Sequence, residues 1–320
     1  MTDARRALAV TKGHGTRNDF VLLDDPDGAL DLGPALVRAL ADRRSGVGGD
    51  GVIRLVRSAH APDAGPALAE DPRATWFMDY RNADGSVAEM CGNGVRVVAA
   101  LAERTGAWDG TGELVLATRA GVRRVRRLGP ADLPGAGAEP WYEVDMGAWA
   151  FPGGPAALDA GQDAEVAVAG LDVPRPALSV DVGNPHTVVA LPDADLLAAA
   201  DLTRAPRVAP TPPHGTNTEL VVPLGEGPDG AGRLRMRVHE RGVGETESCG
   251  TGACAAALAV RAWAGAGAPD AWWVEVPGGT LRVRVTGDRV HLAGPAVLTF
   301  TAEVRRGHRP VTDGGVGLSA

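Results

Sequence analysis

The sequence is poor in lysine, cysteine and aromatic side chains. Lys12 is the only lysine, the cysteines are Cys91, Cys249 and Cys254, and aromatic residues make up 4% of the 320 residues. An enzyme that holds pyridoxal phosphate needs a lysine for its Schiff base, and a single lysine in a glycine-rich turn argues against that cofactor. The odd, sparse set of cysteines argues against a disulfide framework and favours reduced thiols.

Long apolar runs are missing as well. No stretch approaches the ~18 apolar residues of a membrane helix, and the start MTDARRALAVTKG has too short an apolar segment for a signal peptide. The 32 basic residues are outnumbered by 40 acidic ones, which gives a net charge of −8 and disfavours nucleic acid as a partner. We therefore expect a cytoplasmic protein that binds neither membrane nor nucleic acid.

The chain does contain an internal repeat. Residues 89–100, EMCGNGVRVVAA, align without gaps with residues 247–258, ESCGTGACAAAL. The same spacing places residues 120–127 on 278–285 and residues 75–82 on 233–240. A duplicated unit of roughly half the chain is the simplest explanation.

Each unit has the pattern of strands around one helix. Nearly continuous apolar residues from Gly92 to Glu103 and from Gly250 to Ala264 predict a buried helix in each unit. Alternating or β-branched segments predict short strands, at 18–24, 75–81, 113–118, 122–127, 142–146, 217–223, 233–239, 272–276, 281–285 and 296–304. We expect an N-terminal half over residues 1–135, joined by a returning strand within 293–320, and a C-terminal half over 136–292.

Each repeat places a cysteine directly before the Gly-x-Gly that opens its helix. Unpaired N–H groups and the helix dipole concentrate positive potential there, which predicts thiols with a pKa lowered toward neutrality. The free amides after each cysteine can also bind a carboxylate. Inversion of a stereocentre needs two opposed acid/base groups, so Cys91 and Cys249 indicate abstraction and return of an amino acid Cα proton.

Other uses of the thiols stay open from the residues alone. A lone cysteine at a helix start is usually a small buried hydrophobe. Cys254 falls on Arg96 in the repeat, lies outside the symmetry and is interpreted as a core thiol. A zinc site is a weak alternative because no C-x-x-C spacing is present. A redox sensor or a non-catalytic binding module is a further alternative.

Six motifs resemble those of the diaminopimelate epimerase family. They are KGHGTRNDFVLLD (12–24), GVGGDG (46–51), YRNADGSVAEMCGNGVR (80–96), GNPHTVV (183–189), GTNTELV (215–221) and HERGVGETESCGTGACAA (239–256). The resemblance implies an α/β (α+β) fold of two pseudo-symmetric halves, each a mixed sheet or barrel around its helix, with the site in the cleft between them. It also implies a homodimer without cofactor or metal that interconverts LL- and meso-2,6-diaminopimelate for lysine and peptidoglycan synthesis.

The resemblance carries residue roles onto matching positions. Cys91 and Cys249 correspond to the catalytic cysteines, His186 and Glu240 to the residues that tune the thiols, and Arg241 to a partner for the distal carboxylate. The positions that correspond to the family's substrate contacts are Asn18, Asn82, Gly92, Asn93, Asn184, Asn217, Glu240, Arg241, Gly250 and Thr251.

Two departures from the family pattern and one competitor qualify this assignment. Arg17 stands where the family's first motif usually has a second glycine, and Gly51 stands where some members have a substrate-contacting glutamine. Proline and hydroxyproline racemases use the same two-thiol logic, but they typically have Cys-Gly-His where this chain has Cys91-Gly92-Asn93. The phenazine-type isomerases lack the paired cysteines.

Overall fold

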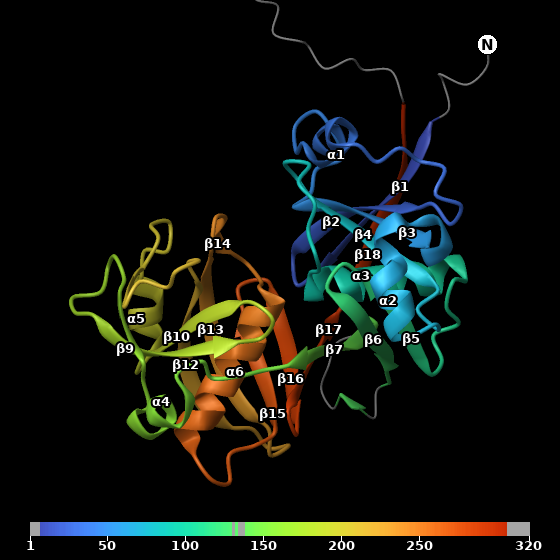
Figure 1. Ribbon diagram of the computed structural model, residues 1–320. Helices are drawn as coiled ribbons and strands as arrows, with labels where there is room; N and C mark the ends of the chain where they lie inside the picture. Colours follow the sequence, from blue (N-terminus) through green and yellow to red (C-terminus); the bar gives the residue numbers. More distant parts are fainter. Residues whose placement is uncertain (1–6, 130–131, 134–137, 306–320) are drawn as a thin grey trace, which may run out of the picture.

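The computed structural model describes residues 7–129, 132–133 and 138–305. Strand pairing divides these residues into two lobes that stand side by side in Figure 1. The N-terminal lobe contains β1 (Leu8–Gly15), β2 (Asn18–Asp24), β3 (Gly51–Arg57), β4 (Trp76–Asn82), β5 (Glu113–Thr118), β6 (Gly121–Leu128), β7 (Trp141–Ala148) and β18 (Val297–Val304). Thus, among the described residues, the last strand pairs with the first.

The C-terminal lobe repeats this arrangement. Its strands are β8 (Ala164–Ala167), β9 (Arg175–Asp181), β10 (Pro185–Ala190), β12 (Asn217–Glu226), β13 (Gly232–Glu240), β15 (Ala271–Val276), β16 (Gly279–Thr286) and β17 (Arg289–Pro295), with the short β11 (Arg207–Ala209) and β14 (Gly244–Thr246) at its margins. The order β8-β9-β10-β12-β13-β15-β16-β17 has the same sequence of parallel and antiparallel pairs as β18-β1-β2-β3-β4-β5-β6-β7. The two lobes therefore share one topology.

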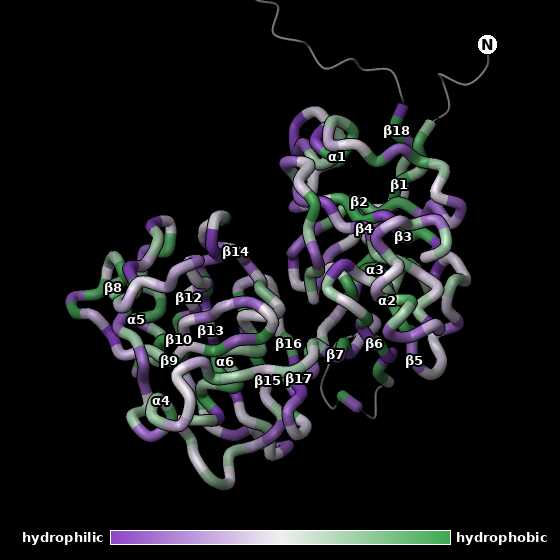
Figure 2. The backbone as a smooth tube through the Cα atoms, in the orientation of Figure 1, coloured by the Kyte–Doolittle hydropathy of each residue, from purple (hydrophilic) through white to green (hydrophobic). Residues whose placement is uncertain are grey.

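One long helix lies inside each lobe. Helix α3 (Gly92–Thr105) packs against the strands of the N-terminal lobe, and α6 (Gly250–Ala264) packs against those of the C-terminal lobe. Helix α3 ends at Gly106, whose φ of +76° suits a glycine C-cap. Figure 2 shows hydrophobic colour along β2 and in the strands around α6. The shorter helices α1 (Pro34–Ala41), α2 (Gly65–Glu70), α4 (Gly154–Ala160) and α5 (Ala194–Ala199) lie outside this core.

Register identifies equivalent positions in the two lobes. Phe20 on β2 faces Gly51 on β3, as His186 on β10 faces Asn217 on β12. Two residues further along β3 and β12 stand Ile53 and Glu219, which are therefore equivalent. By the same register Asn82 at the end of β4 corresponds to Glu240 at the end of β13.

The lobes are joined by an antiparallel pairing of β7 with β17, where Trp141 faces Pro295 and Ala148 faces Arg289. Strand β7 also pairs with β6, and β17 with β16, so these two strands belong to both the lobes and their junction. The division of the chain at residues 135/136 stays a prediction, and parts of it, including residues 306–320, lie outside the described residues.

Candidate active site

The amino termini of the two central helices meet. A Cβ on Gly92 would lie 3.1 Å from Leu292 Cδ2, and a Cβ on Gly250 would lie 2.8 Å from the same atom. The same Cβ on Gly250 would lie 3.4 Å from Asn93 Oδ1. Glycine at both positions thus lets two helix starts converge on one leucine. Because the first amides and the dipole of each helix concentrate positive potential at its start, the meeting point is suited to an anion.

Cys91 caps the first of these helices. It is partly exposed, and its Sγ lies 3.5 Å from Asn18 Oδ1. Asn18 is oriented in turn by Asp50, whose carboxylate accepts from Asn18 Nδ2 at 2.7 Å. Asn93 Nδ2 lies 3.3 Å from the same Asn18 oxygen. The thiol therefore faces amide groups held in place from β2 and from the helix.

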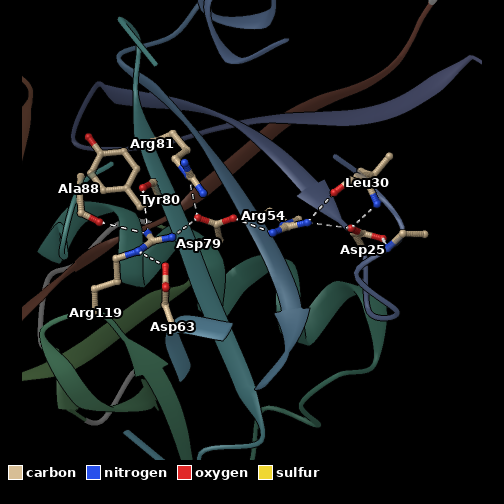
Figure 3. A network of polar contacts seen from close by, with 10 residues as sticks. Asp25, Leu30, Arg54, Asp63, Asp79, Tyr80, Arg81, Ala88 and Arg119 are labelled. Carbon is tan, nitrogen blue, oxygen red and sulfur yellow. Dashed lines mark hydrogen bonds and ion pairs between the residues drawn. The ribbon is translucent and has the colours of Figure 1, made fainter. Parts of the chain in front are cut away.

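The segment that leads into Cys91 is anchored by a buried ion network, drawn in Figure 3. Arg119 donates to the backbone oxygens of Tyr80 and Ala88, each at 3.3 Å, and to Asp79 Oδ1 at 2.6 Å. Arg54 and Arg81 bind the same carboxylate. Burial by itself raises the pKa of Asp79, but the guanidinium groups outweigh burial and lower it. Asp79 thus holds Arg119 in place, and Arg119 fixes the loop before the cysteine through the Ala88 carbonyl.

Cys249 caps the second helix in more acidic surroundings. Its side chain is 6% exposed, its Sγ accepts from Gly252 N at 3.4 Å, and it lies 3.6 Å from Thr251 Oγ1. Glu240 lies within hydrogen-bonding reach of the thiol and accepts a hydrogen bond from Thr246 Oγ1. Burial raises the pKa of Glu240, so this carboxylate is a weaker acid and a stronger base than usual.

The expectation that the thiol pKa values fall toward neutrality is wrong for this structure. Burial raises the pKa of Cys91 to about 11, although the amides of Gly94 and Asn93 act in the opposite direction. Burial, followed by the charges of Glu240 and Glu219, raises the pKa of Cys249 well above its ordinary value. Desolvation disfavours a thiolate more than the helix amides favour it. Both cysteines are therefore thiols at neutral pH.

A buried His–Glu pair lies behind Cys249. His186 Nδ1 is 2.7 Å from Glu219 Oε1, and His186 Nε2 is 3.0 Å from Asn184 Oδ1. Both side chains of the His–Glu pair are fully buried. A Cβ on Gly252 would lie 2.7 Å from Glu219 Oε1, which places the carboxylate directly under the first turn of α6.

Further contacts cross between the lobes beside the cysteines. Thr16 Oγ1 lies 2.6 Å from Ser248 Oγ, and Asn93 Nδ2 donates to the Ser248 carbonyl at 3.1 Å. Arg17 pairs with Glu247 at 3.4 Å on the exposed rim. Thr16 and Arg17 have φ values of +49° and +65°, so the turn before Asn18 adopts left-handed backbone without glycine, and its cross-lobe contacts offset that cost.

Comparison with known proteins identifies the family. The chain matches the family described as diaminopimelate epimerase over residues 10–129 and 178–299. The diaminopimelate epimerase of Streptomyces coelicolor is 45% identical over 304 residues, covering 92% of this chain and 95% of that protein. The chain belongs to the diaminopimelate epimerase family. The diaminopimelate epimerase of Rhodococcus jostii is 44% identical over 306 residues, covering 93% and 97% of the two chains. The expected family and the expected enzyme class, an isomerase, are both confirmed.

Solved structures of lower identity share the fold. A Bacillus anthracis phenazine biosynthesis protein of the PhzF family has a TM-score of 0.63 at 16% identity, covering 93% of this chain and 99% of that one. A hydroxyproline epimerase from Agrobacterium vitis has a TM-score of 0.56 at 14% identity, covering 95% and 93%. At these identities the likeness concerns the fold alone. It confirms the expected α+β architecture of two pseudo-symmetric halves.

The structure brings most of the sequence-predicted residues of this family member to the helix junction. Cys91, Asn18, Gly92, Asn93 and Gly250 meet there. Thr251 and Glu240 lie at the Cys249 thiol, and Asn184 holds His186 behind it. Asn217 accepts from the Arg241 backbone at 2.9 Å, which fixes the chain just after Glu240. The side chains of Asn82 and Arg241 instead bond to Ser86 and His214, and Arg241 is exposed.

Sequence reasoning missed four residues that hold this site together. They are Asp50, Glu219, Thr246 and Ser248. Asp50 and Glu219 each lay inside a recognised motif, but as an acid next to a glycine or within an apolar strand they gave no separate signal. The Gly51 departure also has a structural account. A Cβ there would lie 2.6 Å from the Tyr80 ring, so the tyrosine occupies the space of a longer side chain.

Proposed function

We propose that this enzyme interconverts LL- and meso-2,6-diaminopimelate, with Cys91 and Cys249 acting on opposite faces of one Cα. The carrying observation is the meeting of two cysteine-capped helix starts, which provides one anion site flanked by two thiols. The match to the diaminopimelate epimerase family selects the substrate among amino acids. The amides at Gly92, Asn93, Gly250 and Thr251 bind the carboxylate of the reacting centre.

The reaction needs one thiolate and one thiol. The thiolate of one cysteine takes the Cα proton and becomes a thiol, while the opposite thiol gives its proton to the other face of the carbon and becomes a thiolate. No atom is lost or gained, and the enzyme is left with its two cysteines exchanged in protonation state. Helix amides stabilise the negative charge that develops on the substrate, and a dry site strengthens that effect.

Glu240 moves the proton that converts Cys249 between thiol and thiolate. Its carboxylate lies beside the thiol, and burial raises its pKa, which brings it closer to that of its partner. His186 is held behind it by Glu219 and Asn184. At the distal end of the substrate, the exposed guanidinium of Arg241 binds the second carboxylate bidentately, and asparagine amides bind the ammonium groups.

Two coarser features set the context for this activity. Within the described residues no helix has the length and apolar content needed to cross a membrane. We place the enzyme in the cytoplasm, where Cys91, Cys249 and Cys254, all free of disulfides, stay reduced. We also propose a homodimer on the strength of the family relationship, to be tested by light scattering on the eluting protein.

The decisive experiment follows proton exchange and inversion separately. LL-diaminopimelate is incubated in D₂O without cofactor, and NMR and chiral chromatography measure deuterium at Cα and formation of the meso isomer. We expect wild type to do both and Cys91→Ala and Cys249→Ala each to lose epimerisation by about 10²–10⁴-fold. Cys254→Ala is the matched control, because Cys254 is a buried cysteine that has no counterpart cysteine in the repeat. We expect its activity to stay within about twofold of wild type.

Two outcomes contradict this function. If proline or hydroxyproline exchanges while diaminopimelate is inert, the two-thiol site is retained and the substrate is wrong. If no amino acid exchanges, and peroxide consumes a thiol without turnover of substrate, the redox alternative replaces catalysis.

A further inference from the structure

Arg96 is a buried cation at the seam between the two lobes. It lies on α3 one turn beyond Cys91, and its side chain is 0% exposed. A Cβ on Gly15 would lie 3.0 Å from Arg96 Nη2, and a Cβ on Gly294 would collide with Nη1. Two glycines, on β1 and β17, thus leave the space that the guanidinium fills.

This guanidinium has no carboxylate partner among the described residues. Nη2 donates to Asn93 Oδ1 at 2.5 Å and reaches Thr16 Oγ1 at 3.4 Å, whereas Nε and Nη1 have no hydrogen-bond partner in the described chain. By contrast, Arg54 in the ion network bonds to two aspartates. Burial lowers the pKa of Arg96 to about 10, so it remains charged at neutral pH. A buried unpaired charge is costly, which calls for a compensating anion.

Arg96 interacts electrostatically with two thiols. Cys91 and Cys254 are the groups whose charge acts on the guanidinium, and Arg96 in turn favours the thiolate of each. In the repeat, Cys254 occupies the position of Arg96, so the C-terminal lobe supplies no matching cation. The seam therefore carries one positive charge on the side of Cys91, next to the site where two helix starts converge.

Arg96 also fixes the orientation of Asn93. A guanidinium can only donate hydrogen bonds, so the Asn93 side-chain oxygen must face it. The amide nitrogen then points to the Ser248 carbonyl of the other lobe at 3.1 Å and to Asn18 Oδ1 at 3.3 Å. One hydrogen bond from Arg96 thereby determines a contact that links both cysteine-bearing segments.

We propose that Arg96 is a positioning residue of the reaction: its guanidinium supplies the counter-charge for the anion held between the helix starts and for the Cys91 thiolate, and it locks the Asn93 amide across the lobes. The role in turnover rests on the proposed epimerase function. The electrostatic role does not, because it concerns the thiol and any small anion that approaches it.

The test compares alkylation of Cys91 by iodoacetate and iodoacetamide, which share a leaving group and differ in charge. Peptide mass spectrometry gives the rate at Cys91 for each reagent from pH 7 to 10. We expect Arg96→Met and Arg96→Gln to lower the iodoacetate/iodoacetamide rate ratio about tenfold, the size of one charge-assisted hydrogen bond, and to shift the alkylation profile to higher pH. Arg96→Lys, which keeps the charge, restores most of the ratio.

Turnover and stability complete the test. Neutral variants are expected to lose about 10–100-fold in kcat/KM while their melting temperature stays level or rises, because a buried unpaired charge has been removed. Arg123→Met is the matched control: Arg123 also has a buried Nε without a partner and a pKa lowered by burial, but it lies on β6 away from the thiols, so its ratio should equal that of wild type.

Three results overturn the proposal. The first is an unchanged iodoacetate/iodoacetamide rate ratio in both neutral variants, and the second is an equal fall of that ratio in Arg123→Met. The third is a fall of both the ratio and the melting temperature that Arg96→Lys does not restore. If Arg96→Met does not fold, Arg96→Gln carries the same test, since its amide can still donate to Asn93. The alkylation ratio needs no substrate, so failure of wild type to exchange diaminopimelate would contradict the epimerase function and leave this measurement valid.

Discussion

The two thiol sites have the same backbone and different neighbours. Each cysteine is the extended residue before a central helix, and each helix lies inside the same order of strands. Beneath the first helix, a Cβ on Gly94 would meet Ile53 at 2.9 Å, whereas beneath the second a Cβ on Gly252 would meet Glu219 at 2.7 Å. An apolar contact in one lobe is thus a carboxylate in the other.

The two lobes also differ in charge at other equivalent positions. Phe20 and Ile53 in the N-terminal lobe correspond to His186 and Glu219, Asn82 corresponds to Glu240, and Arg96 corresponds to Cys254. Positive charge therefore lies on the side of Cys91, and negative charge lies around Cys249. Duplication supplied two thiols in opposed positions, and divergence around them made Cys91 the easier one to ionise.

The largest expected effect comes from replacing His186 and Glu219 by the residues at the equivalent positions of the N-terminal lobe, Phe20 and Ile53. His186→Phe alone leaves Glu219 buried without its partner, which we expect to cost about 3–5 kcal/mol of unfolding free energy. Adding Glu219→Ile recreates the Phe20/Ile53 combination and should recover most of that loss, since apolar residues of similar volume replace a buried pair well. Urea unfolding at pH 7 measures both variants.

Glu219→Ile alone is the control for that experiment, because a buried imidazole that loses its partner costs less than a buried carboxylate that loses its own. The double variant should regain stability without regaining full epimerase activity. A double variant as unstable as His186→Phe would mean that the polar pair is needed for the fold itself.

Glu240→Gln should have the next largest effect, about a hundredfold loss in kcat. Because burial raises the pKa of Glu240, wild-type activity should fall in acid at a pH above the usual carboxyl range, as Glu240 becomes protonated and cannot accept a proton from Cys249. This acid limb should vanish in the variant. A pH profile of kcat measures it, with Glu245→Gln on β14 as the control.

The same substitution has an opposite effect on stability. A carboxyl whose pKa is raised by folding binds its proton more tightly in the folded state, so its contribution is present below the unfolded pKa near 4.5 and is lost as pH rises through the folded pKa. Glu240→Gln should therefore melt higher than wild type at pH 7, with a smaller difference at pH 4. Equal differences at both pH values would contradict the raised pKa.

The smallest expected effect is the order in which the two thiols of the wild type are alkylated. With iodoacetamide, Cys91 should react about tenfold faster than Cys249, because Cys91 is partly exposed whereas Cys249 is 6% exposed and is subject to the negative charges of Glu240 and Glu219. The Cys91 rate should rise with pH toward about 11. Cys254, fully buried, is the internal control. Faster alkylation of Cys249 than of Cys91 would contradict this prediction.

Sequence alone predicted the parts of this site that depend on local pattern. The apolar runs after Cys91 and Cys249 correspond to α3 and α6, and the expected strand at 18–24 corresponds to β2. The strands that were not predicted are β1, β3, β8, β9, β10, β11, β14 and β17. The cysteine roles and the substrate contacts remain proposals, because the family match concerns the whole chain and not the role of a single side chain.

What the sequence could not give depends on tertiary contact. Glu219 is 33 residues from His186, and only the parallel register of β10 and β12 brings them together. The thiol pKa values were predicted with the wrong sign because the helix-start amides are visible in the sequence, whereas burial under the opposite lobe is not. The unpaired state of Arg96 likewise requires knowledge of every neighbour.

The pairing of β18 with β1 also bears on how the chain is made. Leu8 faces Val304, so β1 gains that neighbour only after about 290 further residues, up to the end of β18, have been synthesised. All strands of the C-terminal lobe precede β18 in the chain, and domains form as their residues emerge. The lobe that is translated first is therefore the one completed last, and a chain truncated before β18 leaves the edge of β1 open to pair with another molecule.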